Sequence, residues 1–174
     1  AKEKPGTVAF GTAGVGTPQH LTMVRLGEKV GVNWTHVPYK SGIEASTALV
    51  RGDVAVMAQT AEWVPYVRDG RLRLLNVFTE ERMAGFESAP TLVEAGYDLV
   101  APSVLGLVGP KGMDAEVVSK IDKAFKLAID TPEFEKCTDM FGLKTDYKNA
   151  SDFTAHIQKT VAEWEPVIKN LKTD

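Results

Sequence analysis

Cysteine is almost absent from this chain, since Cys137 is the one cysteine among 174 residues. A single cysteine cannot form an intramolecular disulfide, and the three histidines (His20, His36 and His156) lack the paired spacing of a metal site. We therefore expect no disulfide, no metal centre and no other cofactor. In the segment 134–141 the cysteine shares a helical face with two phenylalanines, which predicts a small packed thiol.

Long apolar runs and concentrated charge of one sign are also missing. No stretch of 18 apolar residues occurs, so no membrane-spanning helix is predicted. Residues 1–6 lack the apolar core of a signal peptide, although a signal that had been removed would leave the same pattern. The net charge is −3, with lysine and arginine scattered along the chain. This distribution argues against a nucleic-acid partner.

Short apolar strands alternate with helices over residues 1–100. The predicted strands are 7–10, 33–37, 53–57 and 72–77, and the predicted helices are 18–30, 42–52 and 61–69. Such alternation is typical of βαβ units and a mainly parallel sheet. Ligands of these sheets lie beyond the carboxyl ends of the strands. We therefore expect the loops 11–17, 38–41 and 58–60 to share one rim.

The character of the chain changes near Val100. The following elements are predicted there: helices at 91–95, 114–130, 132–141 and 150–171, and strands at 104–108 and 144–147. Pro166 should kink or break the last helix. We predict an α/β lobe over residues 1–100 and a mostly helical segment over residues 101–174, whose apolar stripes have little sheet to pack against.

The glycine-rich loop, residues 11–17, is the most informative segment. Glycines after a strand let the backbone approach a ligand, and Thr17 with Pro18 opens a helix whose free N–H groups point into the same space. This arrangement favours an anion, although a tight turn with nothing bound has the same pattern. Phosphate fingerprints fail, because Lys-Ser/Thr is missing and Gln19 stands where a dinucleotide motif needs glycine. A carboxylate is the better prediction.

Five side chains of the rim are further candidates for ligand contact. His20 lies one turn into the first helix, where it could face a ligand or pack at the helix start. Tyr39 and Lys40 lie on the second loop, and the lysine could attract an acid or remain solvated. Gln59 and Thr60 lie on the third loop, where an amide suits a carboxylate oxygen and the threonine could merely cap a helix.

Arrangements for nucleophilic catalysis are missing from the pattern. There is no Gly-x-Ser-x-Gly elbow, and no histidine stands near a serine and an acid in a suggestive spacing. The paired acids Glu80 and Glu81 lie in a polar stretch that is typical of a surface. The spacing therefore offers no sign of a nucleophilic enzyme, although residues brought together only by the fold would leave no such pattern.

Five ordered motifs resemble those of the extracytoplasmic solute receptors of tripartite tricarboxylate transporters, also called Bug-type proteins. They are residues 11–21 (GTAGVGTPQHL), 36–42 (HVPYKSG), 70–73 (GRLR), 89–96 (APTLVEAG) and 157–166. The resemblance implies a type II periplasmic-binding-protein fold of two lobes that closes on a small carboxylate. It also implies a periplasmic location, delivery to membrane transporter subunits, and no catalysis.

The resemblance further implies which groups meet the ligand. Carried onto this sequence, they are the backbone N–H groups and the two threonine hydroxyls of Thr12, Ala13, Gly14, Val15, Gly16 and Thr17. The loop 38–41 would line the rim. Many family members have aspartate and asparagine where this chain has Ala58 and Gln59, so the resemblance does not fix the ligand.

The matching region starts about a third of the way into family members. Residues 101–174 would then complete the other lobe, whose N-terminal part is not in this sequence. Without that part the apolar stripes need another partner, and self-association of the chain is one way to bury them. Two other classes stay open at this point, namely the effector domain of a regulator or sensor and a two-lobe enzyme.

Overall fold

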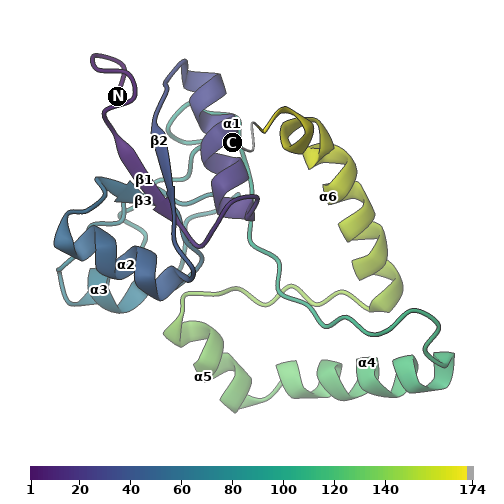
Figure 1. Ribbon diagram of the computed structural model, residues 1–174. Helices are drawn as coiled ribbons and strands as arrows, with labels where there is room; N and C mark the ends of the chain where they lie inside the picture. The colour runs from purple at the N-terminus through teal and green to yellow at the C-terminus, as the bar shows by residue number, and fades with distance from the viewer. Residues whose placement is uncertain (172–174) are drawn as a thin grey trace. The chain divides into compact units, whose positions relative to one another are not determined.

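The computed structural model describes residues 1–171 (Figure 1). The chain forms two compact units. The first contains residues 1–103 together with the end of the last helix from residue 167, and the second contains residues 104–166. Among the described helices, none combines the length and the apolar character needed to cross a bilayer.

The centre of the first unit is a three-stranded parallel sheet. Its strands are β1 (Ala9–Thr12), β2 (Thr35–Pro38) and β3 (Val56–Met57), in the order β2-β1-β3. β1 pairs with Thr35 to Pro38 on one side and with Val56 and Met57 on the other. The predicted α/β fold with a parallel sheet is therefore confirmed.

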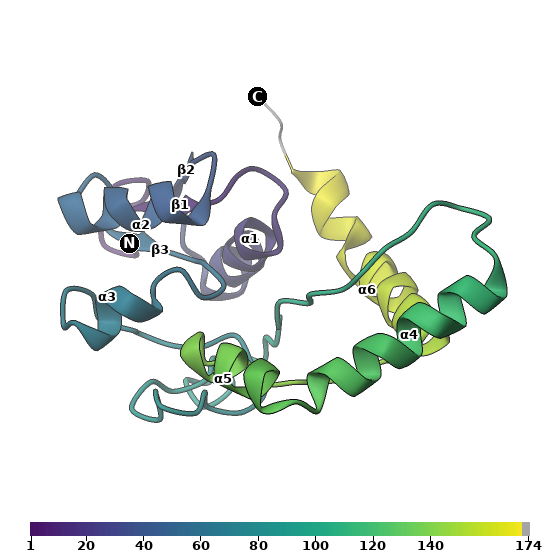
Figure 2. The same cartoon turned by 90° about the horizontal axis from the view of Figure 1, so that it is seen from below.

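Two helices connect these strands, α1 (Pro18–Val30) and α2 (Gly42–Arg51). The chain moves from β1 to β2 in one direction and from β2 past β1 to β3 in the other. Because crossovers between parallel strands are right-handed, these opposite moves place α1 and α2 on opposite faces of the sheet. The two helices flank the strands in this way in both views (Figures 1 and 2).

The ends of both helices follow the predicted signals. Thr17 is the N-cap of α1, and its side chain accepts a hydrogen bond from the N–H of His20. Gly31 ends this helix with φ 63°, a left-handed conformation that glycine adopts without strain. Ser41 caps α2, and the carboxylate of Glu44 accepts a hydrogen bond from the N–H of Lys40.

The core of the first unit forms between β1, α1 and later segments of the chain. Its buried members are Phe10, Met23, Leu26, Ala58, Leu92 and Leu99. Trp34 packs against this cluster, and its indole N–H donates to the carbonyl of Met23 at 3.1 Å. Residues beyond position 90 therefore help to hold the sheet and its helix in place.

Several predicted elements of the first unit were wrong. Residues 72–77 do not join the sheet, and only Val77 forms a bridge, to Thr91. Residues 91–95 form turns instead of a helix. The third helix, α3 (Val64–Arg68), begins three residues later than predicted, with Trp63 at its N-cap position.

The second unit contains α4 (Ala115–Ile129), α5 (Pro132–Met140) and most of α6 (Ala150–Asn170). The predicted strands 104–108 and 144–147 do not form, and no residue of these three helices is buried. Cys137 is exposed, so the prediction of a packed thiol was wrong. α6 continues past Pro166, although the missing proline N–H leaves the carbonyl of Ala162 without its helical donor.

Replacing Gly27 by alanine is expected to destabilise the first unit, although alanine is normally the better helix former. A Cβ at this position would lie 2.9 Å from the carbonyl oxygen of Val32 and 3.2 Å from the indole nitrogen of Trp34. Such overpacking typically costs about 1–3 kcal/mol. Urea unfolding should show this loss, whereas Glu28→Ala on the exposed face of α1 should change stability little. A more stable Gly27→Ala variant would contradict the prediction.

Candidate functional site

The three loops predicted to form one rim do meet at the carboxyl edge of the sheet. The N–H of Tyr39 donates to the carbonyl of Thr12 at 2.9 Å, and the N–H of Ala58 donates to the carbonyl of Gly11 at 3.0 Å. The side-chain amide of Gln19 donates to the hydroxyl of Thr60 at 2.7 Å. These bonds tie the glycine-rich loop to both other loops.

Two glycines of the glycine-rich loop adopt backbone angles that other residues rarely take. The φ angle is 137° at Gly14 and 77° at Gly16. A Cβ at Gly16 would meet no atom within 4 Å, so the surface beside it is open. Glycine is therefore required at position 16 by the backbone conformation and not by crowding.

The N–H groups of this loop divide into two kinds. The N–H of Gly14 donates to the Thr12 hydroxyl at 3.2 Å, and the N–H of Gly16 donates to Nδ1 of His20 at 3.1 Å. Within residues 1–171, the N–H groups of Ala13, Val15 and Thr17 have no acceptor in the protein. These three amides are the ones that remain for a ligand, and the predicted anion site rests on them.

The two threonine hydroxyls of the loop have partners inside the protein. The Thr12 side chain is completely buried, and its Oγ1 lies 3.0 Å from the carbonyl of Gly14 and 2.7 Å from Nε2 of His36. The Thr17 hydroxyl donates to the same carbonyl at 2.9 Å. The burial of the Thr12 hydroxyl favours a role in organising the loop over direct contact with a ligand.

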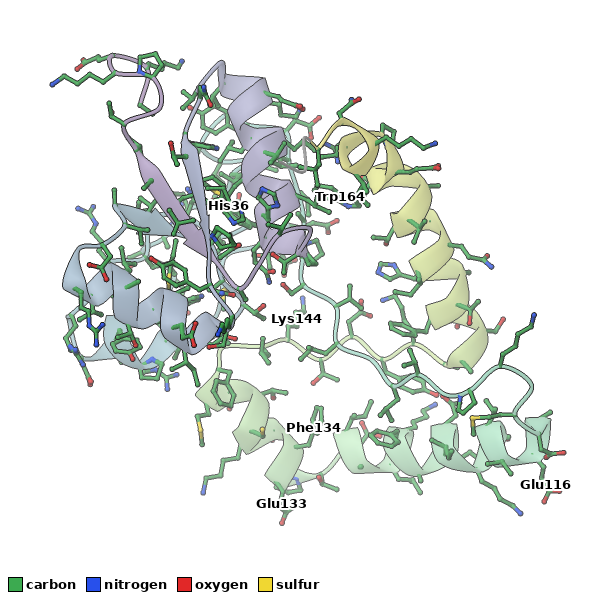
Figure 3. The ribbon with its side chains drawn as sticks, viewed as in Figure 1. His36, Glu116, Glu133, Phe134, Lys144 and Trp164 are labelled. Atoms are coloured by element: carbon green, nitrogen blue, oxygen red, sulfur yellow. The ribbon has the colours of Figure 1, made fainter. Side chains whose placement is uncertain are left out.

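His20 and His36 are stacked on each other, and we call this pair the histidine stack. The ring centroids are 3.8 Å apart with an interplanar angle of 13°, and Phe10 stacks on His36 with centroids 4.9 Å apart. Figure 3 labels His36, which comes from β2. The sequence left two roles open for His20. Its 7% exposure favours packing at the helix start over direct ligand contact.

Both rings of the histidine stack are disposed to be neutral. Burial lowers the pKa of His20 below its ordinary value. Burial, and then the charge of His20, lower the pKa of His36 to about 4. The N–H of Gly16 requires an unprotonated Nδ1 on His20, so the proton of the neutral ring is on Nε2.

The N-termini of α1 and α2 differ in their electrostatics. The first turn of α2 contains Glu44, whose carboxylate already accepts an N–H bond at that helix end. The first turn of α1 contains no acidic residue. A helix N-terminus carries a partial positive charge, so the N-terminus of α1, unlike that of α2, remains available to an external anion.

The other predicted contact residues differ in how far they reach the rim. The Tyr39 ring is half-buried and lies over Gly11, close enough that a Cβ there would be 3.1 Å from it. Lys40 is exposed. The side-chain amide nitrogen of Gln59 is buried and has no hydrogen-bond partner among the described residues. Thr60 does not cap α3, since its hydroxyl accepts from Gln19.

Sequence reasoning missed two members of this rim. The side-chain amide of Gln19 also donates to the hydroxyl of Ser103 at 3.2 Å, which lies 3.3 Å from the hydroxyl of Thr60. In the sequence, Gln19 stands out only as part of the motif 11–21 and as a departure from a dinucleotide motif, and Ser103 follows a stretch without periodicity. The described residues contain no group of histidine, cysteine and acidic side chains that could hold a metal ion.

Comparison with known sequences gives a match along the chain. A family model described as "Tripartite tricarboxylate transporter family receptor" matches residues 1–173. A protein of Cupriavidus necator, named "UPF0065 protein in gbd 5'region", is 40% identical over 171 residues, which are 98% of this chain and 52% of that protein. The chain thus spans about half the length of the curated relatives that it matches over nearly all its residues.

Solved structures share the fold. A TctC solute-binding protein from Polaromonas, determined without ligand, is 27% identical with a TM-score of 0.77, over 98% of this chain and 59% of that one. MatC from Rhodopseudomonas palustris, determined with bound malate, is 25% identical with a TM-score of 0.79, over 94% of this chain and 57% of that one.

Proposed function

The chain belongs to the tripartite tricarboxylate transporter receptor family, and from this premise we propose that it forms part of a periplasmic receptor for a small organic carboxylate. The receptor would deliver this ligand to its membrane transporter subunits and would catalyse no reaction. The similar protein whose structure holds bound malate supports a carboxylate as the ligand class. Its identity and the transporter partner are part of the proposal.

One observation carries this proposal beyond family membership. The N-terminus of α1 has no acidic side chain in its first turn, and it adjoins N–H groups of Val15 and Thr17 that have no acceptor among the described residues. Amides and a helix N-terminus that converge on one open surface bind anions. A carboxylate oxygen would therefore find its donors at this loop.

Gly16→Val is expected to weaken carboxylate binding by about tenfold or more, and Lys40→Ala by less than about fivefold. Valine at φ 77° is strained, so the loop would change its backbone and move the two neighbouring amides. Lys40 is exposed and offers a solvent-screened charge, worth under about 1 kcal/mol. Calorimetry of the full-length protein with its ligand checks the order. The reverse order would move the binding site to the second loop.

The proposal is tested by identifying what the full-length protein carries. Native mass spectrometry after purification from the periplasm should show a bound mass of an organic acid, which is lost on unfolding. Titration with malate and adipate should then compete with that acid. A full-length protein that carries no acid and binds neither compound, but turns over a substrate or binds a different solute class, would contradict the proposed function.

A further inference from the structure

The histidine stack fixes the backbone of the glycine-rich loop through hydrogen bonds. Nδ1 of His20 accepts the N–H of Gly16 at 3.1 Å. Nε2 of His36 lies 2.7 Å from the hydroxyl of Thr12, which in turn accepts the N–H of Gly14. Each glycine of positive φ in the loop is thus fixed by one of the two rings, directly or through Thr12.

We propose that His20 and His36 are positioning residues that clamp the glycine-rich loop in its ligand-binding shape, and that protonation of the stack releases the loop and weakens ligand binding. The effect on ligand binding rests on the proposed function, whereas the clamp itself does not. Neither ring needs to touch the ligand, because the two histidines act through the backbone of Gly14 and Gly16.

The hydrogen bonds make the clamp sensitive to protons. A proton on Nδ1 of His20 would face the N–H of Gly16, so two donors would oppose each other and the Gly16 peptide would have to turn. Rotation of that peptide also moves the neighbouring N–H groups of Val15 and Thr17. These two N–H groups would then no longer point toward the same ligand position, and ligand binding would weaken.

The surroundings make protonation of the stack costly until the pH is low. The ring contacts and hydrogen bonds of the two histidines involve Phe10 from β1, the Thr12 hydroxyl and the N–H of Gly16, and none of these groups carries a charge. The two rings are 3.8 Å apart, so a charge on one disfavours a charge on the other. The lowered pKa values of both histidines agree with this environment.

The sign of the pH effect follows from these directions. The folded-state pKa of His36 is about 4, against 6.5 for an exposed histidine. Between these values the unfolded chain binds protons that the native chain does not. Stability of the loop region is therefore full above pH 6.5 and is lost as the pH falls toward 4. The pKa of His20 is lowered too, so the clamp should open as the pH falls below the ordinary histidine value of 6.5.

The decisive variants keep the hydrogen bond and remove the proton. His20→Asn places an amide oxygen near the position of Nδ1, so it can accept from Gly16 without titrating. His20→Leu removes the acceptor, and His36→Gln keeps a partner for Thr12 without titrating. His156→Gln, in the second unit, is the matched control that removes an unrelated histidine.

The first measurement needs no ligand. NMR of the chain should show the Gly16 amide protected from exchange at pH 7, with protection falling at least about tenfold toward pH 4 after correction for intrinsic exchange. His20→Asn should hold its protection across this range, and His20→Leu should lack protection at every pH. A wild-type amide that keeps its protection through the titration of both histidines overturns the clamp. Unchanged protection of the α2 amides shows that each variant is folded.

The second measurement uses malate as the probe. Calorimetry at pH 7 and pH 4.5 should show that wild type and His156→Gln lose about two- to fivefold more affinity than His20→Asn and His36→Gln. Malate ionises identically in all these titrations, so the ratio isolates the histidines. Equal losses in all variants would overturn the coupling of the clamp to the ligand. Absence of binding by wild type at pH 7 would count against malate as a ligand, and amide exchange would then decide the clamp.

Discussion

Phe10→Ala is expected to lower the free energy of unfolding of the first unit by about 3–5 kcal/mol, the usual cost of emptying a buried phenylalanine site. The Phe10 side chain is 1% exposed and lies at the centre of β1. It packs in the core cluster and stacks against both members of the histidine stack. The loss is a large share of the roughly 5–15 kcal/mol that stabilises a typical domain.

Urea unfolding followed by tryptophan fluorescence measures this loss. Phe10→Leu fills most of the same volume, so its cost should be clearly smaller, under about 1.5 kcal/mol. Val15→Ala is the surface control, because the Val15 side chain is 57% exposed, and it should change stability by less than about 0.5 kcal/mol. A Phe10→Ala variant as stable as the surface control would show that the core does not depend on this strand.

The 174-residue chain is expected to self-associate through the apolar faces of its C-terminal helices. Val117, Ile121 and Phe125 follow one another at helical spacing on α4, and all three are at least 40% exposed. Ile157 and Val161 on α6 are also exposed. Burying such side chains is worth roughly 1.5–3 kcal/mol each, so a second copy of the chain that covers them gains several kcal/mol.

Light scattering after size-exclusion chromatography should give a mass of at least twice the 18.9 kDa of one chain at about 100 μM, falling on dilution. The double variant Ile121→Lys/Phe125→Lys should run as a monomer. Lys123→Gln, an exposed change between them on the same helix, should leave the mass unchanged. A wild-type chain that stays monomeric at every concentration would refute this expectation.

Local signals in the sequence were sufficient for the part of the fold that carries the site. The alternation of strands and helices up to Met57, the caps at Thr17 and Ser41, and the left-handed stop at Gly31 all appear in the structure. Each of these depends on a few neighbouring residues. The parallel sheet then follows, because strands separated by helices have little alternative.

The failures lie where an element needs a distant partner. Residues 72–77 and 104–108 have the composition of strands, but a strand forms only beside another strand, and neither segment joins the sheet among the described residues. The same dependence on distant partners explains which contacts of the candidate site were not predicted. Sequence spacing predicted the loop and its amides, but it did not reveal that His36 stacks on His20 or that Gln19 reaches Ser103.

The strand order has a consequence for the speed of folding. β1 comes first in the chain and lies at the centre of the sheet. Its ladders are complete only when residues 35–38 and residues 56 and 57 have paired with it. The ladders join residues 26 positions apart for β2 (Ala9 and Thr35) and 46 positions apart for β3 (Phe10 and Val56), and parallel pairings at such separations form slowly. The β1–β2 ladder, which closes the shorter loop, is therefore expected to form before the β1–β3 ladder, and the packing of Leu92 and Leu99, which lie still farther along the chain, is expected to follow.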